Sequence, residues 1–278
     1  MDESSGRRTI DLPVDPFLPC ARENDGIEVL GHRGCRAPGF PENSVAAVTE
    51  ALLQGADGVE IDVRLTADGA LVCTHDSFAF TRTGARQPVA TCASSDLLGA
   101  DGRTPLATLT DVLAAAQCPD GARVVVEVKP VAEAAAASRT ASALADVLRT
   151  CAGNARITVS SFDAALLAMI RAACADLPVR TALLGEKADP VADVVRRAHE
   201  DAHDEVHLPL VGVRRLPQVV ETAHALGLYV ALWTVNRRTE LQWVAGLGAD
   251  AVITDDVLTA WSELDRAVVE EAAALTAA

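Results

Sequence analysis

DGVEIDV, residues 57–63, is the stretch on which our interpretation of this 278-residue chain depends. Apolar, β-branched residues alternate in it with Glu60 and Asp62. Such alternation is typical of a β-strand, because successive side chains of a strand point to opposite faces. Glu60 and Asp62 therefore share one face, where they repel each other unless a shared cation lies between them. The stretch predicts a strand that holds a divalent metal ion.

The composition limits the kinds of protein that this chain can be. Half of the residues are hydrophobic, which is enough for one large domain or two small ones. The formal net charge of −15 argues against nucleic acid or an anionic membrane as the main partner. Lys129 and Lys187 are the only lysines of the chain, so a lysine inside a site motif attracts notice.

Cysteine usage and hydropathy bear on the compartment. The seven cysteines are scattered, odd in number and include no CxxC pair, which favours reduced thiols over a disulfide framework or a zinc site. Residues 1–17 contain no apolar segment of signal-peptide length. No stretch approaches the ~20 uninterrupted apolar residues of a membrane span. We therefore expect a cytoplasmic protein without a membrane span; the sequence does not indicate its oligomeric state.

The remaining chain alternates between short apolar runs and helical patterns. Residues 1–26 are polar, contain prolines and predict an irregular N-terminal arm. The domain itself is expected over 27–278. Strands are predicted at 27–34, 57–63, 123–130, 156–161, 178–185, 205–210, 228–236 and 249–256. Helices are predicted from Asn43 as N-cap to Gly55, and at 109–117, 132–151, 163–174, 188–200, 213–227, 238–248 and the Ala-rich C-terminus.

Eight strands in strict alternation with eight helices indicate a parallel sheet closed into a (β/α)₈ TIM barrel of the α/β class. The alternative is an open doubly wound sheet, which usually carries a GxGxxG loop after its first strand. GHRGCRAPGF, residues 31–40, lacks that pattern. An extra extended run at 71–76 follows the second strand. Residues 77–107 then show weak periodicity and predict a short insertion.

In a barrel, the active site lies at the carboxyl ends of the strands. The polar residues of this sequence gather at those ends: His32, Arg33, Glu60, Asp62, His75, Asp76, Glu127, Lys129, Ser160, His207, Trp233, Asn236 and Asp255. No comparable set occurs at the amino ends of the predicted strands. We expect the chemistry at one rim, with His207 as a structural residue and Asn236 ordering its loop.

A metal site is expected from Glu60, Asp62 and Glu127. Three carboxylates offer only oxygen ligands, which suit one Mg²⁺ or Ca²⁺ and disfavour zinc. The sequence leaves the choice between Mg²⁺ and Ca²⁺ open.

Four further rim residues predict phosphate chemistry beside that metal. Arg33 and Lys129 offer positive charge, for which a phosphate is the natural partner. His32 and His75 suit a general acid and a general base, because histidine ordinarily titrates near neutral pH. A metal, two cations and two histidines form a coherent set for cleaving a phosphodiester. Which histidine is the acid is left open.

The order of these motifs resembles the glycerophosphodiester phosphodiesterase family. The match extends over about residues 28–258. The matching motifs are HRG at 32–34, PENS at 41–44, EIDV at 60–63, HD at 75–76, EVK at 127–129, SSF at 160–162, WTVN at 233–236 and TDD at 254–256. The resemblance implies a TIM barrel with an insertion after the HD loop. Here the insertion is short, and the first loop carries an unusual CRAPGF before PEN, so the substrate is less certain than the reaction class.

Carried over by position, the resemblance implies that Glu60, Asp62 and Glu127 bind the metal, that His32 and His75 exchange protons, and that Arg33 and Lys129 hold the phosphate. Glu42 would order the first loop or contact metal or substrate. Its alternative role is that of a charge near the start of a helix. Trp233 is expected in the substrate pocket, with packing at the rim as the alternative.

The implied reaction is hydrolysis of a small-molecule glycerophosphodiester to an alcohol and sn-glycerol 3-phosphate. Two alternatives stay open. The substrate could be a lysophospholipid, or a sugar or natural-product phosphodiester. The chain could also be a barrel that binds a phosphate ligand without catalysis.

Overall fold

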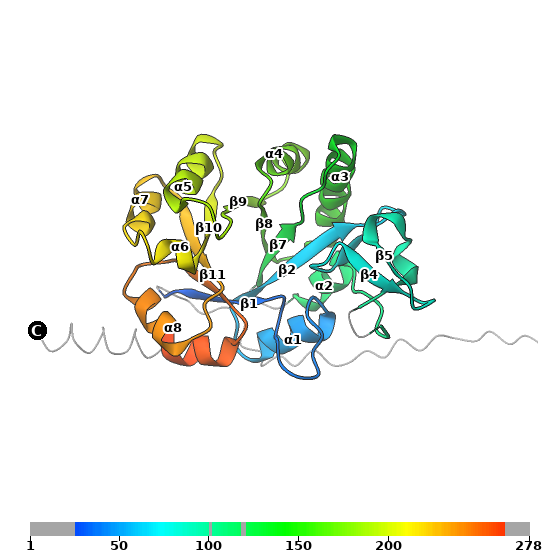
Figure 1. Ribbon diagram of the computed structural model, residues 1–278, viewed down its shortest axis with the longest axis horizontal. Coiled ribbons are helices and arrows are strands. Elements are labelled where there is room, and N and C mark those ends of the chain that lie inside the picture. Colours follow the sequence, from blue (N-terminus) through cyan, green and yellow to red (C-terminus); the bar gives the residue numbers. More distant parts are fainter. Residues whose placement is uncertain (1–25, 100–101, 118–120, 265–278) are drawn as a thin grey trace, which may run out of the picture.

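The computed structural model describes residues 26–99, 102–117 and 121–264. The predicted arm at 1–26 therefore lies almost wholly outside the described residues. Eight parallel strands form a closed barrel (Figure 1). They are β1 Glu28–His32, β2 Gly58–Leu65, β7 Arg123–Val128, β8 Arg156–Ser161, β9 Arg180–Leu184, β10 Glu205–Pro209, β11 Tyr229–Trp233 and β12 Ala251–Thr254. β1 pairs with both β2 and β12, which closes the sheet. The predicted TIM barrel is confirmed.

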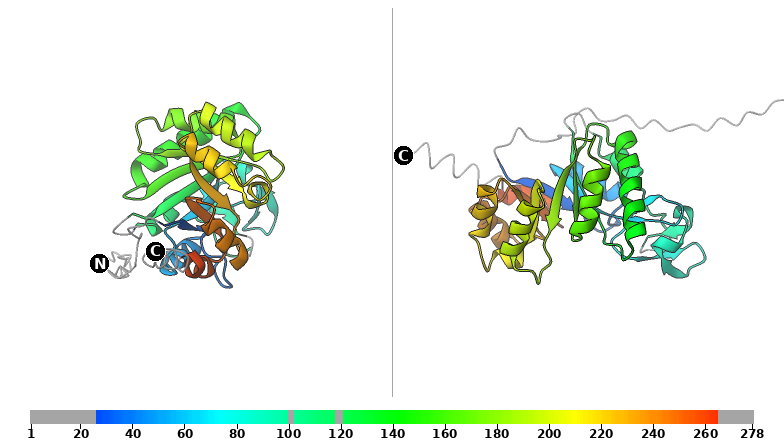
Figure 2. Two further views of the ribbon diagram at one scale, coloured as in Figure 1. Left: turned by 90° about the vertical axis from the view of Figure 1, so that its left-hand side faces the viewer. Right: turned by 90° about the horizontal axis from the view of Figure 1, so that it is seen from above.

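Helices surround the strands and cover their outer faces (Figure 2). They are α1 Val45–Leu53, α2 Leu109–Ala115, α3 Ala134–Cys151, α4 Ala164–Ala173, α5 Val191–Glu200, α6 Leu210–Val213, α7 Val219–Ala225 and α8 Arg238–Ala245, with a further helical run at 257–264. Their buried residues pack on the outward side chains of the strands in one large apolar core. Among the described residues, no helix is long and apolar enough to span a membrane.

Two predicted helix boundaries were wrong. Asn43 does not cap α1; Ser44 does, and its hydroxyl accepts a hydrogen bond from the backbone N–H of Ala47. Asn43 instead has a left-handed backbone and binds Asp62. The helix predicted at 213–227 begins only at Val219, as α7, and the short α6 ends at Val213 before it; Pro217, which lies between them, provides no backbone N–H to continue a helix.

The insertion after β2 is a small antiparallel sheet. The run at 71–76 contributes β3, Leu71–Cys73, which pairs with the extended end of β2. β4 Phe78–Thr81, β5 Arg86–Pro88 and β6 Leu97–Leu98 form a separate three-stranded sheet, beside the tip of β2 in Figure 1. The insertion is thus attached directly to the strand that carries Glu60 and Asp62.

The interior of the barrel is built in layers of four side chains from alternate strands. Strand stagger in such a barrel advances the register by about two residues for every second strand. With the observed ladder registers, one layer contains Glu60, Ser160, His207 and Ile253. The layer above it contains His32, Glu127, Leu184 and Trp233. The layer below is apolar and consists of Leu30, Val125, Ala182 and Ala231.

A charged network closes the amino end of the barrel, contrary to the expectation that a polar set occurs only at the carboxyl ends of the strands. Arg123 is only 3% exposed and pairs with Glu28 and with the fully buried Glu205. Its guanidinium also lies over the ring of Tyr229, 4.4 Å from the ring centroid. Burial raises the pKa of Glu205, but the hydrogen bond with His207 and the charge of Arg123 outweigh it and hold the pKa below its ordinary value. Arg123 therefore balances charge inside the barrel.

We predict that Arg123→Ala destabilises the fold by about 3–5 kcal/mol, because it leaves Glu205 buried without its main counter-ion. Urea unfolding at neutral pH would measure this loss. Arg180→Ala is the matched control, since Arg180 also pairs with Glu205 but is half exposed. Its cost should be below about 1 kcal/mol. Equal losses for the two variants would contradict the role given to Arg123.

The pH dependence of this difference has a fixed sign. The pKa values of Glu28 and Glu205 are lowered, so their contribution to stability is present above their ordinary pKa of 4.5. It is lost as the pH falls from there through the lowered values. The stability gap between wild type and Arg123→Ala should therefore shrink below pH 4.5.

Candidate active site

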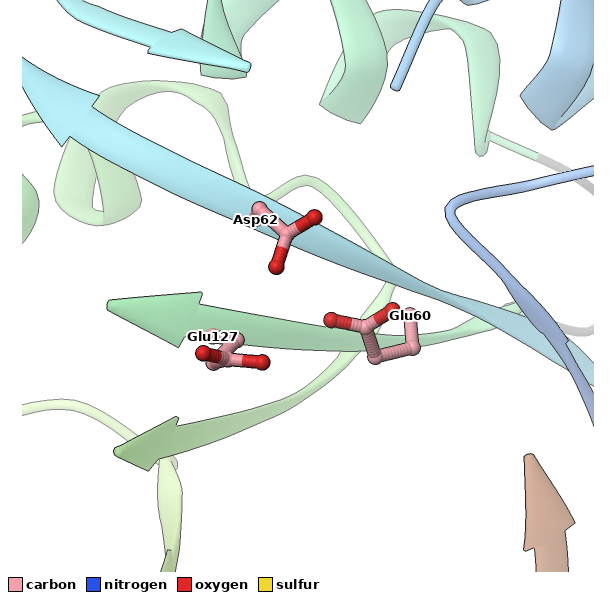
Figure 3. A group of neighbouring side chains, drawn as sticks. All are labelled: Glu60, Asp62 and Glu127. Atoms are coloured by element: carbon pink, nitrogen blue, oxygen red, sulfur yellow. The ribbon is translucent and has the colours of Figure 1, made fainter. Parts of the chain in front are cut away.

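Three carboxylates meet at the carboxyl ends of β2 and β7. Glu60 and Asp62 extend from β2 and Glu127 from β7, where Asp62 and Glu127 are register partners. Their carboxyl groups turn toward one another in Figure 3, and one oxygen of each lies within 4.8 Å of the others. All three residues are buried. The sequence pattern thus located both the strand pair and the shared face.

Two cations compensate this negative charge. The Nζ atom of Lys129 donates to Glu127 and lies 2.6 Å from Oδ1 of Asp62. Nε of Arg33 lies 3.1 Å from Oδ2 of Asp62, and the backbone N–H of Arg33 donates to Glu60. Burial lowers the pKa of Lys129, but Glu127 and Asp62 more than offset it and raise the pKa above its usual value. Both cations predicted to hold phosphate are therefore charged and directly beside the carboxylates.

The chemistry of the cluster fits a divalent cation. Burial, followed by the charges of Asp62 and Glu127, raises the pKa of Glu60 well above its ordinary value. Burial and Asp62 also outweigh Lys129 and raise the pKa of Glu127 to about 6. Oε1 of Glu60 is buried and has no hydrogen-bond partner among the described residues. Three oxygen donors with excess negative charge and one unpartnered oxygen suit Mg²⁺ or Ca²⁺.

His32 is held in place by the residue that follows the neighbouring strand β12. Its Nδ1 lies 2.7 Å from Oδ1 of Asp255, and its Nε2 lies 3.9 Å from Oε2 of Glu60. Asp255 also accepts hydrogen bonds from Asn236 and Arg36. Burial raises the pKa of Asp255, but the hydrogen bond from His32 and those from Asn236 and Arg36 hold it well below its ordinary value. The ionised carboxylate therefore directs Nε2 of His32 toward the carboxylate cluster.

His75 lies on the loop after β3 and is more exposed than His32. Its Nδ1 is 3.1 Å from Oδ1 of Asp76, and its backbone carbonyl accepts two hydrogen bonds from the guanidinium of Arg64. Both predicted histidines line the same cavity, whose volume is about 620 Å³. The two side chains thus approach one space from β1 and from the insertion side.

The same cavity contains most of the predicted set. Arg33, Glu60, Glu127, Lys129 and Trp233 line it together with the two histidines. Trp233 makes an edge-to-face contact with Phe162, with 5.9 Å between the ring centroids. Asp62 and Glu42 are not among the residues that line this cavity, and Glu42 lines the neighbouring groove instead. Glu42 is half exposed and pairs with Arg33 and Arg36, so it orders the first loop. It does not lie in the first turn of α1.

Two residues of the site were not assigned to it from sequence. Asn43 binds Asp62 twice: its amide donates to Oδ2 at 2.8 Å, and its Oδ1 accepts from the backbone N–H at 2.9 Å. Asp255 was noted at the rim but not as the partner of His32. Asn236 orders its loop, as expected, by accepting from the Asp255 backbone and donating to the Asp255 carboxylate. The sequence feature that could have assigned both residues to the site is their position in the PEN and TDD motifs.

A barrel with buried carboxylates, two cations and two histidines around one rim cavity defines a class of phosphate-processing TIM barrels. Comparison with known sequences specifies the family. The glycerophosphoryl diester phosphodiesterase family matches residues 32–259. The chain is 32% identical over 262 residues to a Mycobacterium tuberculosis protein named probable glycerophosphodiester phosphodiesterase 1, covering 86% of this chain and 93% of that relative.

Solved structures share the fold. A glycerophosphodiester phosphodiesterase from Parabacteroides distasonis superposes with a TM-score of 0.74 at 22% identity and covers 88% of this chain and 99% of its own. An Oleispira antarctica phosphodiesterase, solved in complex with the product sn-glycerol 3-phosphate, gives 0.72 at 22% identity, with coverages of 86% and 97%. This chain belongs to the glycerophosphoryl diester phosphodiesterase family and is a phosphoric diester hydrolase.

We predict that Lys129→Met destabilises the protein in the presence of chelator by about 3 kcal/mol, because two buried carboxylates lose their shared counter-ion. Added Mg²⁺ or Ca²⁺ should restore part of the loss. Chemical unfolding with and without the cation would measure both effects. Lys187→Met is the control, since the only other lysine is exposed at the same cavity. A Lys129→Met protein as stable as wild type in chelator would contradict the charge balance described above.

Proposed function

We propose that this protein hydrolyses a glycerophosphodiester to an alcohol and sn-glycerol 3-phosphate, with one divalent cation, Mg²⁺ or Ca²⁺, as cofactor. The observation that carries the proposal is the single cavity in which the carboxylate cluster, Lys129 and Arg33 meet both histidines. The Oleispira relative, whose bound product is sn-glycerol 3-phosphate, supports the choice of substrate class.

Glu60, Asp62 and Glu127 would hold the cation. When bound, it would neutralise charge on the phosphodiester and on the transition state. Arg33 and Lys129 are the residues of this chain that would hold the phosphate oxygens. Their contacts with Asp62 fix both cations in place before substrate arrives, so little reorganisation is needed at the moment of reaction.

His32 and His75 would move the protons. Asp255 accepts from Nδ1–H of His32, so Nε2 is the atom that exchanges a proton in the cavity. Nδ1 of His75 similarly faces Asp76. One histidine would take the proton of the attacking oxygen, and the other would protonate the departing alkoxide.

The main test is a panel of phosphodiesters assayed with and without chelator. We expect release of alcohol and sn-glycerol 3-phosphate from a glycerophosphodiester such as glycerophosphocholine or glycerophosphoethanolamine. Chelator should abolish this activity, and Mg²⁺ or Ca²⁺ should restore it. Binding of these compounds without any turnover would favour a barrel that only binds phosphate ligands. Turnover of sugar or natural-product phosphodiesters alone would show that the substrate belongs to one of those classes and is not a glycerophosphodiester.

The proton-transfer roles predict a graded variant series. His32→Ala and His75→Ala should each lower kcat by about 10²–10⁴-fold. Asp255→Asn, which only positions His32, should lower it by about 10–100-fold, as loss of an orienting carboxylate does elsewhere. Asp256→Asn is the matched control, because the Asp256 carboxylate caps the helix at 257–264 through Thr259. It should cost stability and not turnover; near-full activity in His32→Ala would disprove the assignment.

A second substrate class is favoured by a groove beside His75. The groove has a volume of about 680 Å³ and runs between the first loop and the insertion. Phe40, Phe78, Phe80, Leu98 and Pro105 give it an apolar lining. Phe78 is 45% exposed, which is high for a phenylalanine. A groove of this kind next to a proposed catalytic residue suits the acyl chain of a lysophospholipid.

We predict that Phe78→Ser lowers kcat/KM for a lysophospholipid by about tenfold, since a buried aromatic contact contributes about 1.5–3 kcal/mol. Turnover of glycerophosphodiesters without acyl chains should be unchanged. Leu258→Ser is the control, because Leu258 is an exposed apolar residue on the helix at 257–264. If wild type does not cleave lysophospholipids, the groove is not an acyl-chain site.

A further inference from the structure

The layer directly beneath His32 and Glu127 is unusually polar. Interior layers of such barrels are normally filled with branched apolar side chains. Here the layer consists of Glu60, Ser160, His207 and Ile253, and all four residues line the active-site cavity. We call this layer the cavity floor. Three of its four side chains are therefore polar at a depth where burial of polar groups is costly.

Three floor atoms have no protein partner. Oε1 of Glu60, Oγ of Ser160 and Nδ1 of His207 are buried, and none makes a hydrogen bond within the described residues. Ser160 is 1% exposed and His207 is fully buried. An unpaired buried polar atom costs about 1–3 kcal/mol, so native proteins rarely retain one without a use. The proposed cation accounts for Glu60, but it leaves Ser160 and His207 unexplained.

The hydrogen-bonding character of His207 is fixed from below. Its Nε2 lies 3.0 Å from Oε2 of Glu205, which Arg123 and Thr158 also contact. The pKa of Glu205 is lowered, so the carboxylate is ionised and must accept from Nε2–H. Burial also lowers the pKa of His207, which keeps the ring neutral. Nδ1 therefore presents a lone pair to the cavity and requires a donor from the ligand.

His207 is separate from the carboxylate cluster. The groups of acidic, histidine and cysteine side chains close enough to share one ion, among the described residues, comprise only Glu60, Asp62 and Glu127. Whatever occupies the cavity above the floor must therefore satisfy His207 and Ser160. Nδ1 accepts, and the serine hydroxyl both donates and accepts, so an alcohol hydroxyl is the group that complements the pair.

We propose that Ser160 and His207 bind a hydroxyl group of the glycerol half of the substrate. This inference rests on the proposed function and specifies its selectivity. The floor is the enclosed end of the cavity, while the varying alcohol requires the open end near Phe162, Lys187 and Trp233. In a substrate without an acyl chain, the small constant half, glycerol, fits the enclosed end. Ser160 and His207 thereby distinguish glycerol phosphates from other phosphate esters.

The test compares two ligands that differ only in hydroxyl groups: sn-glycerol 3-phosphate and propyl phosphate. Calorimetry with saturating Mg²⁺ or Ca²⁺ measures binding without turnover. Wild type should bind the glycerol compound about tenfold more tightly, the scale expected for one or two hydrogen bonds in a buried site. In Ser160→Ala this preference should fall to near unity, because only glycerol phosphate binding weakens. His207→Phe should give the same result if circular dichroism shows that it folds.

Ser161→Ala is the matched control. Ser161 is the adjacent residue on β8 and is equally buried, but its hydroxyl donates to the carbonyl of Val128 outside the barrel interior. This variant should keep the tenfold preference. A Ser160→Ala protein with the same preference as Ser161→Ala would overturn the inference. Failure of the proposed function is distinguishable, since wild type would then hydrolyse no glycerophosphodiester, whatever the binding preference.

Discussion

The repulsion among three buried carboxylates is the constraint on which the whole active-site rim depends. The pairing of β2 with β7 brings Glu60, Asp62 and Glu127 together, and the direct contacts of Lys129 and Arg33 offset their repulsion. Two positive charges against three negative ones leave the cluster short of balance, which is what gives it affinity for a cation. Arg33 reaches Asp62 from a left-handed backbone at the end of β1. The conformation of the first loop therefore follows from the charge of the second strand.

The sequence predicted the barrel and the cluster because both depend on local periodicity. Alternation in residues 57–63 placed Glu60 and Asp62 on one face, and the same spacing in residues 127–129 placed Glu127 beside Lys129. Neighbouring parallel strands then brought the two faces together. The strands of the insertion are only two to four residues long and have no period from which they could be recognised.

The contacts of Asp255 and Asn43 could not be predicted from the sequence for a different reason. Asp255 is 223 residues from His32 in sequence, and no local pattern reveals that their side chains meet. Asn43 has the residue type of an N-cap and stands next to a helix, yet Ser44 performs that function. Tertiary structure decides between them, because the two separate groups of the Asn43 amide contact Asp62 at once: the NH₂ group donates to the carboxylate, and the oxygen accepts from the backbone N–H. Residue type alone does not reveal which of two competing partners a side chain has.

The network of Arg123, Glu205 and His207 connects the amino end of this barrel to the active-site cavity at the carboxyl end. In TIM barrels the amino end usually serves stability and the carboxyl end chemistry. Here the ion pair of Arg123 and Glu205 continues through a hydrogen bond to His207 on the cavity floor, crossing the apolar layer in between. The protonation and tautomer of a residue on the cavity floor are thus set by charges at the far mouth. Substitutions at the amino end would affect the active site electrostatically, without contact with a ligand. Selection on activity therefore extends to the end of the barrel that faces away from the reaction.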